Sequence, residues 1–390
     1  MGQETSERRK KPFQLARGIG KPPRCSDNAD LTNHSSSRSG SESDSPVHTV
    51  LPLLAPVTPF RSKRTPPAAQ LSLQDRPQNF KYFRTWASFV RVGREKTTKV
   101  LLTGGSGNLG QALVPRLLDK GDTPVILDVR VPPRLNEGAV FIEGSVLDRS
   151  KLTEIFRGCD SIVHIAAWHG IHENRGEKDA YDFFDLNVRG TFEVFEAVAL
   201  AGVGKVIFIS TTSVYRPDTR YGSSKVLAEL IAEDYRKHRL MNVVTLRPRG
   251  FIPYWDRAVY DRYSDWARWF WKGAVHIDDV ATAVILSLDL LFRRQLDQQL
   301  VLTLDSAHEY TDADLDHWDA AGPGSTFRKY YPEYYDLALS YGLDPALKPT
   351  KLDISETVRW LGYKSAYSLA NLLSELAAFG DKGPPNITEN

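Results

Sequence analysis

The chain has 390 residues, of which 41% are hydrophobic, so it is long enough to bury a large core. Its formal net charge of +2 gives no electrostatic reason to expect nucleic acid as a partner. The two cysteines, Cys25 and Cys159, argue against a disulfide framework and against a cysteine metal site, and no metal site is expected.

The segment 1–96 shows no sustained helical or strand periodicity and is rich in serine, proline and arginine. Such a segment buries too little apolar surface to offset its ordering entropy, so we expect a disordered or targeting tail. The apolar piece 50–57 is too short and too rich in proline to span a membrane, and no membrane partner is expected. A cytoplasmic location is the default, although the basic, serine-rich tail leaves organellar targeting open.

A glycine cluster follows the apolar run 100–102 and precedes an amphipathic helical pattern. The order of strand, glycine turn and helix is typical of a dinucleotide-binding turn. Gly104 would form the tight turn, Gly107 would let a pyrophosphate approach the main chain, and Gly110 would let the helix pack closely on the sheet. The helix N-terminus would then face the phosphates. A plain glycine-rich loop is the alternative.

Strand-like and helix-like segments alternate after this turn. Predicted strands cover 123–128, 139–144, 161–166, 205–210 and 242–246, and predicted helices cover 110–120, 150–156, 180–201 and 221–238. Nearly continuous apolar strands that alternate with helices predict an α/β fold, with a Rossmann-type doubly wound parallel sheet covered on both faces. Ligands of such sheets bind at the carboxyl ends of the strands, so these ends should converge on one crevice.

The pattern loosens after Pro248 into a stretch rich in aromatic residues, followed by a helix from 277 to about 291 and a strand at 300–304. We therefore expect a dinucleotide-binding Rossmann domain at 97–248 and a smaller substrate-binding region at 249–380. Within the second region, 275–305 should return to the Rossmann domain, and 381–390 should form a tail.

Asp128 ends the second predicted strand, about 18 residues after Gly110. This is close to the spacing at which an acid contacts the adenosine ribose hydroxyls. Its carboxylate would repel a 2'-phosphate, so NAD is favoured over NADP, although Arg130 nearby weakens that preference. A simple turn acid at a strand end is the alternative.

Tyr221 and Lys225 stand four residues apart at the start of a predicted helix, so their side chains can address one site. A tyrosine has a pKa near 10, and work as a base near neutrality requires a fall of about three units, or about 4 kcal/mol. The charge of Lys225 and a positively charged nicotinamide ring are suitable sources. The strand before this helix ends in hydroxyl residues, one of which could hold the substrate oxygen while Tyr221 takes its proton.

The order of these motifs resembles the extended short-chain dehydrogenase/reductases, the NAD-dependent epimerase/dehydratase family. The resemblance covers about residues 99–379. It is carried by TGGSGNLG at 103–110, VHIAA at 163–167, NVRGT at 187–191, ST at 210–211 with VY at 214–215, YGSSK at 221–225, LRP at 246–248 and VHIDDV at 275–280.

The resemblance implies roles for several residues. Thr211 would be the hydroxyl beside the reacting carbon, Tyr221 the base, and Lys225 the residue that binds the nicotinamide ribose and lowers the pKa of Tyr221. Asn187 would support the active site from its helix. The expected cofactor-binding residues are Gly104, Gly107, Asn108, Leu109, Gly110, Asp128, Ala166, Ala167, Tyr221 and Lys225, and the expected substrate residues are Trp168, Thr212 and Arg249. Family analogy also suggests a homodimer.

The sequence departs from the family pattern at three places. Ser145 stands where an aspartate commonly meets adenine, which puts that contact in doubt. Thr212 and Ser213 stand where sugar-nucleotide dehydratases carry an acid pair, which argues against water elimination. Only five residues separate Tyr215 from Tyr221, where family members usually carry a longer substrate loop.

The sequence therefore predicts an NAD-dependent enzyme that transfers a hydride at a secondary alcohol of a sugar or nucleotide sugar. An epimerase is the first hypothesis. A dehydrogenase of a small free sugar acid, similar to the uronate dehydrogenases, is the alternative that the short loops favour. A non-catalytic NAD-binding scaffold is a further alternative, against which the intact set of Thr211, Tyr221 and Lys225 argues.

Overall fold

The structure, a computed structural model, describes residues 97–385. The tail predicted at 1–96 and the end of the tail predicted at 381–390 lie outside the described residues. Within the described part, no helix has the length and apolar character needed to cross a membrane.

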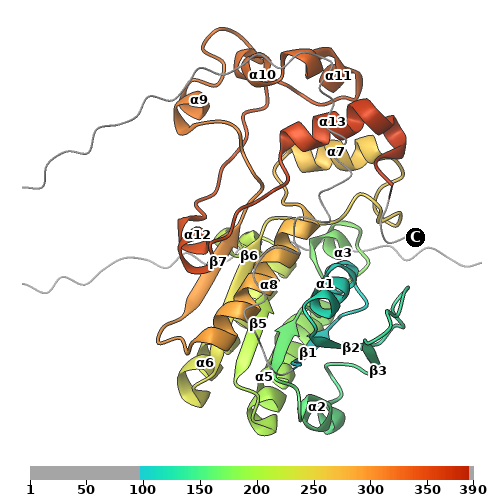
Figure 1. Cartoon of the computed structure of the whole chain (residues 1–390), viewed down its shortest axis with the longest axis vertical. Helices are drawn as coiled ribbons and strands as arrows, with labels where there is room; N and C mark the ends of the chain where they lie inside the picture. Colours follow the sequence, from blue (N-terminus) through green and yellow to red (C-terminus); the bar gives the residue numbers. More distant parts are fainter. Residues whose placement is uncertain (1–96, 386–390) are drawn as a thin grey trace, which may run out of the picture. The chain divides into compact units, whose positions relative to one another are not determined.

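Seven parallel strands form one sheet in the order β3-β2-β1-β4-β5-β6-β7 (Figure 1). The strands are β1 (Lys99–Thr103), β2 (Thr123–Asp128), β3 (Val140–Glu143), β4 (Ser161–His164), β5 (Lys205–Ile209), β6 (Asn242–Pro248) and β7 (Leu300–Leu304). The inner strands are buried along most of their length, as their continuous apolar runs indicate, whereas β3 lies at the edge and is largely accessible. The predicted doubly wound parallel sheet is confirmed.

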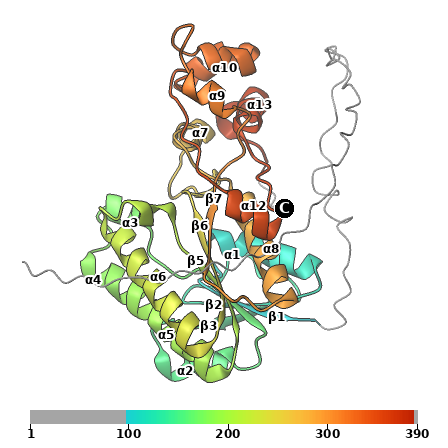
Figure 2. The same cartoon turned by 90° about the vertical axis from the view of Figure 1, so that its left-hand side faces the viewer.

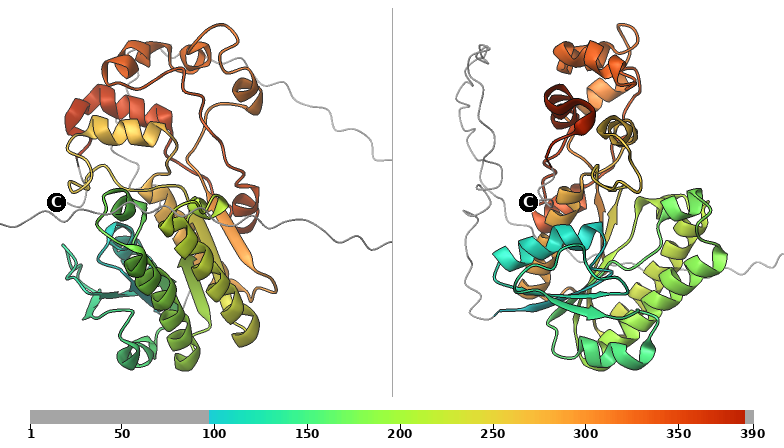
Figure 3. Two further views of the ribbon diagram at one scale, coloured as in Figure 1. Left: turned by 180° about the vertical axis from the view of Figure 1, so that it is seen from behind. Right: turned by 90° about the vertical axis from the view of Figure 1, so that its right-hand side faces the viewer.

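Helices cover both faces of the sheet (Figure 2). On one face, α1 (Asn108–Asp119) packs beside α8 (Ile277–Arg293). On the other face lie α2 (Arg149–Phe156), α5 (Gly190–Ala201) and α6 (Arg220–Arg239), as Figure 3 shows from two further sides. Both buried cores are almost wholly aliphatic apart from a few phenylalanine and tyrosine rings.

The helix predicted at 180–201 differs in its middle. It begins as α4 (Ala180–Phe183), continues through a π-helical segment (Phe184–Arg189) and ends as α5. Asp179 caps its start by accepting hydrogen bonds from the main-chain N–H groups of Tyr181 and Asp182. The π-helical turn contains the buried residue Asn187.

A second group of helices gathers above the carboxyl ends of the strands (Figure 1). It comprises α7 (Tyr263–Trp271), α9 (Asp312–Asp316), α10 (Ser325–Tyr330), α11 (Tyr335–Ser340) and α13 (Leu369–Phe379). We call it the aromatic cap because tyrosine, tryptophan and phenylalanine dominate its buried core. The helix α12 (Ser355–Leu361) lies instead against β7 and α8, and both of these belong to the sheet region.

Candidate active site

The glycine turn between β1 and α1 has the shape that its sequence predicts. Gly104 has a φ of +68°, and a Cβ there would lie 2.8 Å from the Cα of Ala166. At Gly110 a Cβ would lie 2.0 Å from the main-chain oxygen of Gly105, so only glycine allows this close packing. At Gly107 a Cβ would approach only the carbonyl oxygen of Gly104, at 3.2 Å. The open side of the turn is therefore at Gly107.

The N-terminus of α1 starts at this open side. Gly107 is its N-cap, no side chain caps the helix, and its first turn holds no acid. Its main-chain N–H groups and its partial positive charge therefore fit the pyrophosphate of a dinucleotide. Leu109 is only 2% exposed and packs in the aliphatic core, so its main chain alone can face a cofactor. Asn108 donates from its side chain to Asp256 (2.8 Å), in the segment between β6 and α7.

Asp128 lies at the end of β2, next to the glycine turn. One of its carboxylate oxygens accepts a hydrogen bond from the N–H of Ser106 (3.1 Å), and the other accepts from the N–H of Arg130 (3.0 Å). These are the bonds that a turn acid makes. A carboxylate has about four acceptor positions, so the position at the turn also leaves acceptors for a ribose.

A buried hydrogen-bonded chain connects the end of β1 with the segment that contains Asn187. Thr191 donates its single hydroxyl proton to the carbonyl oxygen of Asn187 (2.6 Å), so it can only accept from Nε2 of His164 (3.0 Å). Nδ1 of His164 must then accept from the hydroxyl of Thr103 (2.7 Å). Burial lowers the pKa of His164 to about 3, which agrees with a neutral ring. The hydroxyl of Thr103 in turn accepts from the N–H of Ala166 (3.4 Å).

Thr211 and Tyr221 contact each other at the end of β5. Thr211 is buried, and its hydroxyl also accepts from the N–H of Ser213 (3.1 Å). Burial raises the pKa of the Tyr221 phenol to about 12, and the hydrogen bond with Thr211 opposes part of that rise. The lowering of this pKa by Lys225 beside the nicotinamide ring stays a prediction. Thr212, half-buried, follows directly in the 3-10 turn Thr212–Tyr215.

Lys225 lies one helical turn after Tyr221 and is 2% exposed. Its ammonium donates to the carbonyl oxygen of Ile209 (2.7 Å) and lies 4.3 Å from the ring centre of Phe208. Burial lowers the pKa of Lys225 to about 7, whereas the charge of Glu229 acts in the opposite direction. The ammonium of Lys225 thus lies at the end of β5. Burial reduces the fraction of Lys225 that is charged at neutral pH.

Asn187 holds the chain that follows β4. Its side-chain oxygen accepts from the N–H of Trp168 (2.8 Å), and its amide donates to the carbonyl oxygen of Trp168 (2.8 Å). The amide also donates to the hydroxyl of Ser224 in α6 (2.9 Å). Trp168 is half-buried, and the ammonium of Lys178 lies 4.3 Å from its ring centre. Ala167, also half-buried, directly precedes it.

The guanidinium of Arg249 already has two partners within the protein. Its guanidinium forms an ion pair with Asp305 (2.5 Å) at the end of β7 and donates to the carbonyl oxygen of Thr350 (2.5 Å). Its assignment to the substrate stays a prediction, and these two partners already occupy its side chain.

Two carboxylates beside the site were not predicted from the sequence. Glu229 accepts from the hydroxyl of Ser210 (2.5 Å) and forms a two-bond pair with Arg247 (2.9 and 2.5 Å). Its position four residues after Lys225 was a usable signal, because such residues share a helical face. Glu173 accepts from main-chain N–H groups at the start of α6, and no sequence pattern reveals such a contact. Within residues 97–385, no group of three His, Cys, Asp or Glu side chains could hold a metal ion.

Comparison with known proteins connects this geometry with one family. Residues 100–253 match the family described as NAD dependent epimerase/dehydratase. A UDP-glucose 4-epimerase from Erwinia amylovora is 32% identical over 165 residues, which are 35% of this chain and 48% of that protein. An L-arabinose 1-dehydrogenase (NAD(P)(+)) from Haloferax volcanii is 29% identical over 177 residues, 38% of this chain and 65% of that protein. The chain matches about half of the length of the first such relatives.

Solved structures show the same fold. A UDP-glucose 4-epimerase from Brucella ovis, solved in complex with NAD, superimposes with a TM-score of 0.55 at 18% identity. The match covers 74% of this chain and all of that one (100%). The family match ends at residue 253, close to the end of β6 and ahead of the aromatic cap. Residues 100–253, which form most of the sheet region, thus match the NAD dependent epimerase/dehydratase family.

Proposed function

We propose that this protein is an NAD-dependent epimerase that acts at a secondary alcohol of a sugar or nucleotide sugar, with Tyr221 as the base. The observation that carries this proposal is the contact between Thr211 and Tyr221 at the end of β5, one helical turn before the buried Lys225. The relatives that are UDP-glucose 4-epimerases support the choice of reaction and of substrate class.

The glycine turn and the N-terminus of α1 would hold the pyrophosphate of NAD. Asp128 would bind the adenosine ribose, the main chain at Ala166 and Ala167 would line the pocket, and Lys225 would bind the nicotinamide ribose. When bound, NAD supplies a hydride acceptor and a positive charge on its nicotinamide ring.

The residues of this chain would then handle the proton. Thr211 would hold the substrate hydroxyl, and the phenolate of Tyr221 would take its proton as the hydride leaves the carbon. A pKa near 12 is too high for this role, so binding of the cofactor must lower the pKa of Tyr221. In an epimerase the hydride returns to the opposite face of the carbon, and the proton returns to the oxygen.

A screen of UDP-glucose, UDP-galactose and free uronates with NAD tests the proposal. We expect an isomeric product without accumulation of NADH, and we expect Tyr221→Phe to lose at least about 100-fold in turnover while it still binds NAD. Full turnover by Tyr221→Phe would rule out this base. Normal NAD binding and unchanged cellular function in that variant would support the scaffold hypothesis.

A dehydrogenase of a small sugar acid is the second candidate. The short connection between Tyr215 and Tyr221 supports it, because little chain is available there to hold a nucleotide diphosphate. The similarity to an L-arabinose dehydrogenase points in the same direction. Formation of one NADH for each sugar consumed would select this candidate over the epimerase.

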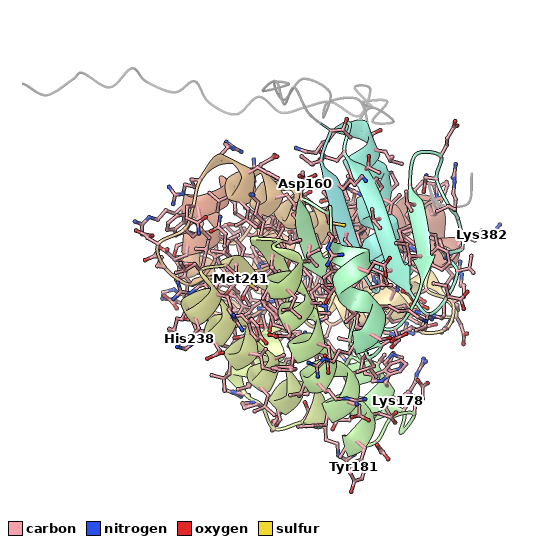
Figure 4. The ribbon with its side chains drawn as sticks, turned by 90° about the horizontal axis from the view of Figure 1, so that it is seen from below. Asp160, Lys178, Tyr181, His238, Met241 and Lys382 are labelled. Carbon is pink, nitrogen blue, oxygen red and sulfur yellow. The ribbon has the colours of Figure 1, made fainter. Side chains whose placement is uncertain are left out.

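A homodimer is the expected assembly. Apolar side chains are exposed along the outer face of the α5 and α6 layer, among them Phe184 (55%), Leu200 (60%) and Leu230 (63%). Tyr181 at the start of α4 is 82% exposed and projects away from the fold (Figure 4). A second copy would cover this face, and light scattering on the purified protein would give the mass of the assembly.

A further inference from the structure

The N-terminus of α6, which carries Tyr221, is held by a carboxylate from a distant part of the chain. Glu173, in α3 (Gly170–Asn174), accepts hydrogen bonds from the main-chain N–H groups of Arg220 (2.9 Å) and Tyr221 (3.0 Å). Each bond uses a different carboxylate oxygen. The cap residue of the helix, Thr219, accepts with its side chain only from the N–H of Gly222 (2.9 Å). One of the helix-end donors that Glu173 satisfies therefore belongs to Tyr221 itself.

Charge strengthens this contact. The first turn of α6 holds no acidic residue, so Glu173 brings a negative charge to a helix end that favours one. Hydrogen bonds from N–H groups to an ionised carboxylate are also stronger than bonds between neutral groups. Glu173 is thus a strong attachment point for the first two residues of α6.

The segment that carries Glu173 is itself fixed to the site. Trp168, just before α3, is bonded in both directions to the side chain of Asn187. A Cβ at Gly170 would lie 3.5 Å from a ring carbon of Tyr221, so α3 passes against the phenol ring. Tyr221 is therefore held through its main chain by Glu173 and along its ring by the start of α3.

We propose that Glu173 is a positioning residue for Tyr221. By tying the first two N–H groups of α6 to α3, it sets the place of the phenol relative to Thr211. This inference rests on the proposed role of Tyr221 as the base. A displacement of a catalytic group by about 1 Å can cost about 100-fold in rate, so a main-chain attachment of this kind matters for catalysis.

Two substitutions and one control separate positioning from simple capping. Glu173→Ala removes both bonds, whereas Glu173→Gln keeps one acceptor oxygen. Thr219→Ala removes a cap from the same helix end but leaves the attachment to α3 intact. We expect Glu173→Ala and Thr219→Ala to show similar falls in melting temperature, because each loses a cap of the same helix end.

Turnover then gives the first readout, with UDP-glucose or D-glucuronate as the probe, according to which one the wild-type protein converts. We expect kcat to fall about 10- to 100-fold in Glu173→Ala and less in Glu173→Gln, with KM and NAD affinity changed less than about twofold. We expect Thr219→Ala to keep kcat within about threefold of wild type. A loss in Glu173→Ala no larger than in Thr219→Ala overturns the inference.

The second readout needs no sugar. With NAD as the sole ligand, the difference in phenolate absorbance between the protein and the same protein with Tyr221→Phe gives the pKa of Tyr221. We expect a higher pKa in Glu173→Ala than in Glu173→Gln, because both variants lose the charge of Glu173 but only Glu173→Ala loses the attachment that keeps Thr211 bonded to the phenol. Equal pKa values in the two variants overturn the inference. Normal turnover by Tyr221→Phe would contradict the proposed function. An inactive Tyr221→Phe together with a fully active Glu173→Ala would contradict only the role of Glu173.

Discussion

The sheet region and the aromatic cap are built from different side chains. Valine, leucine and isoleucine fill the two cores of the sheet region, whereas tyrosine, tryptophan and phenylalanine fill the core of the cap. Aliphatic packing is non-directional and depends mainly on buried area and shape. Buried phenol and indole groups must in addition find hydrogen-bond partners.

The cap meets that demand with specific pairs. Tyr263 and Tyr367 both donate to the carboxylate of Glu375 (2.5 Å each). The indole N–H of Trp266 donates to the carbonyl oxygen of Ile252 (2.9 Å), and that of Trp271 donates to the carbonyl oxygen of Asp344 (3.0 Å). Burial raises the pKa of Glu375, which shows that this carboxylate is held at a cost. The stability of the cap thus depends on specific hydrogen bonds, whereas that of the sheet region depends on the burial of apolar side chains.

One of the two largest expected effects comes from the tightest point of the sheet region. In Gly110→Ala the new Cβ meets the main chain of Gly105, which cannot move aside as a side chain could. We expect a loss of about 3 kcal/mol or more in unfolding free energy, measured by thermal or urea unfolding. Gly107→Ala is the matched control: it should keep the fold but weaken NAD binding about tenfold. Wild-type stability in Gly110→Ala would contradict the close packing described here.

A substitution that creates a cavity in the cap tests whether the cap and the sheet region unfold independently. Trp266 is 1% exposed, so Trp266→Ala should destabilise the cap by about 3–5 kcal/mol. Because the glycine turn belongs to the sheet region, NAD affinity in titration calorimetry should stay within about threefold of wild type. A parallel loss of NAD binding and of the near-ultraviolet aromatic signal would show that the two regions unfold together.

The buried charge of Lys225 makes the site an exception within the aliphatic sheet region. Its pKa is lowered from 10.5 to about 7, so below pH 7 the folded protein bears the full burial cost. Between about pH 7 and 10.5 the folded protein loses the proton while the unfolded chain keeps it, so stability should rise with pH.

Lys225→Met removes this charge. We expect a higher melting temperature at pH 6, by about 2–4 °C for each kcal/mol recovered, and a smaller rise between pH 7 and 10. Turnover should be lost. A lower melting temperature across this whole pH range would show that the bond to Ile209 outweighs the burial cost.

The smallest effect is expected where the two regions join. Asp279 in α8 accepts from the N–H groups of Ala366 (2.8 Å) and Tyr367 (3.1 Å), just before α13. Burial raises its pKa from 3.8 to about 6. The folded protein therefore keeps a proton that the unfolded chain loses in this range, and stability from this group falls as pH rises from about 4 to 6.

Asp279→Asn should flatten that pH dependence and change stability at pH 7 by no more than about 1 kcal/mol. Urea midpoints at pH 4 and pH 7 measure both quantities. An unaltered pH dependence in this variant would assign the slope to another group.

Sequence patterns predicted the sheet region closely, because strands buried on both faces leave continuous apolar runs. The strands expected at 123–128 and 300–304 have those bounds in the structure, and the helix expected at 277 to about 291 ends at 293. The π-helical turn was missed, since six residues are too few to reveal a changed period. The short helices of the cap were also not individually predicted, because directional bonds between distant residues hold them.

The candidate site shows the same division. Thr211, Tyr221 and Lys225 stand in recognisable motifs, and the structure places Thr211 in contact with Tyr221. Glu173 was not found, because its partners are main-chain N–H groups 47 and 48 residues away, and main-chain donors leave no mark on a sequence. The rise that burial causes in the pKa of Tyr221 was not expected from the sequence, and the ammonium of Lys225 is bonded to Ile209.

The π-helical turn at Phe184–Arg189 requires a fixed number of residues in this segment. Such a turn holds one residue more than an α-helical turn, so deleting any one residue there would restore an uninterrupted α-helix. Everything before the deletion would then rotate by about 100° relative to everything after it. Phe183, which is buried before the turn, and Thr191, which is bonded to His164 after it, could then not both keep their present positions. The fold should therefore tolerate single substitutions in this segment but not the deletion of one residue.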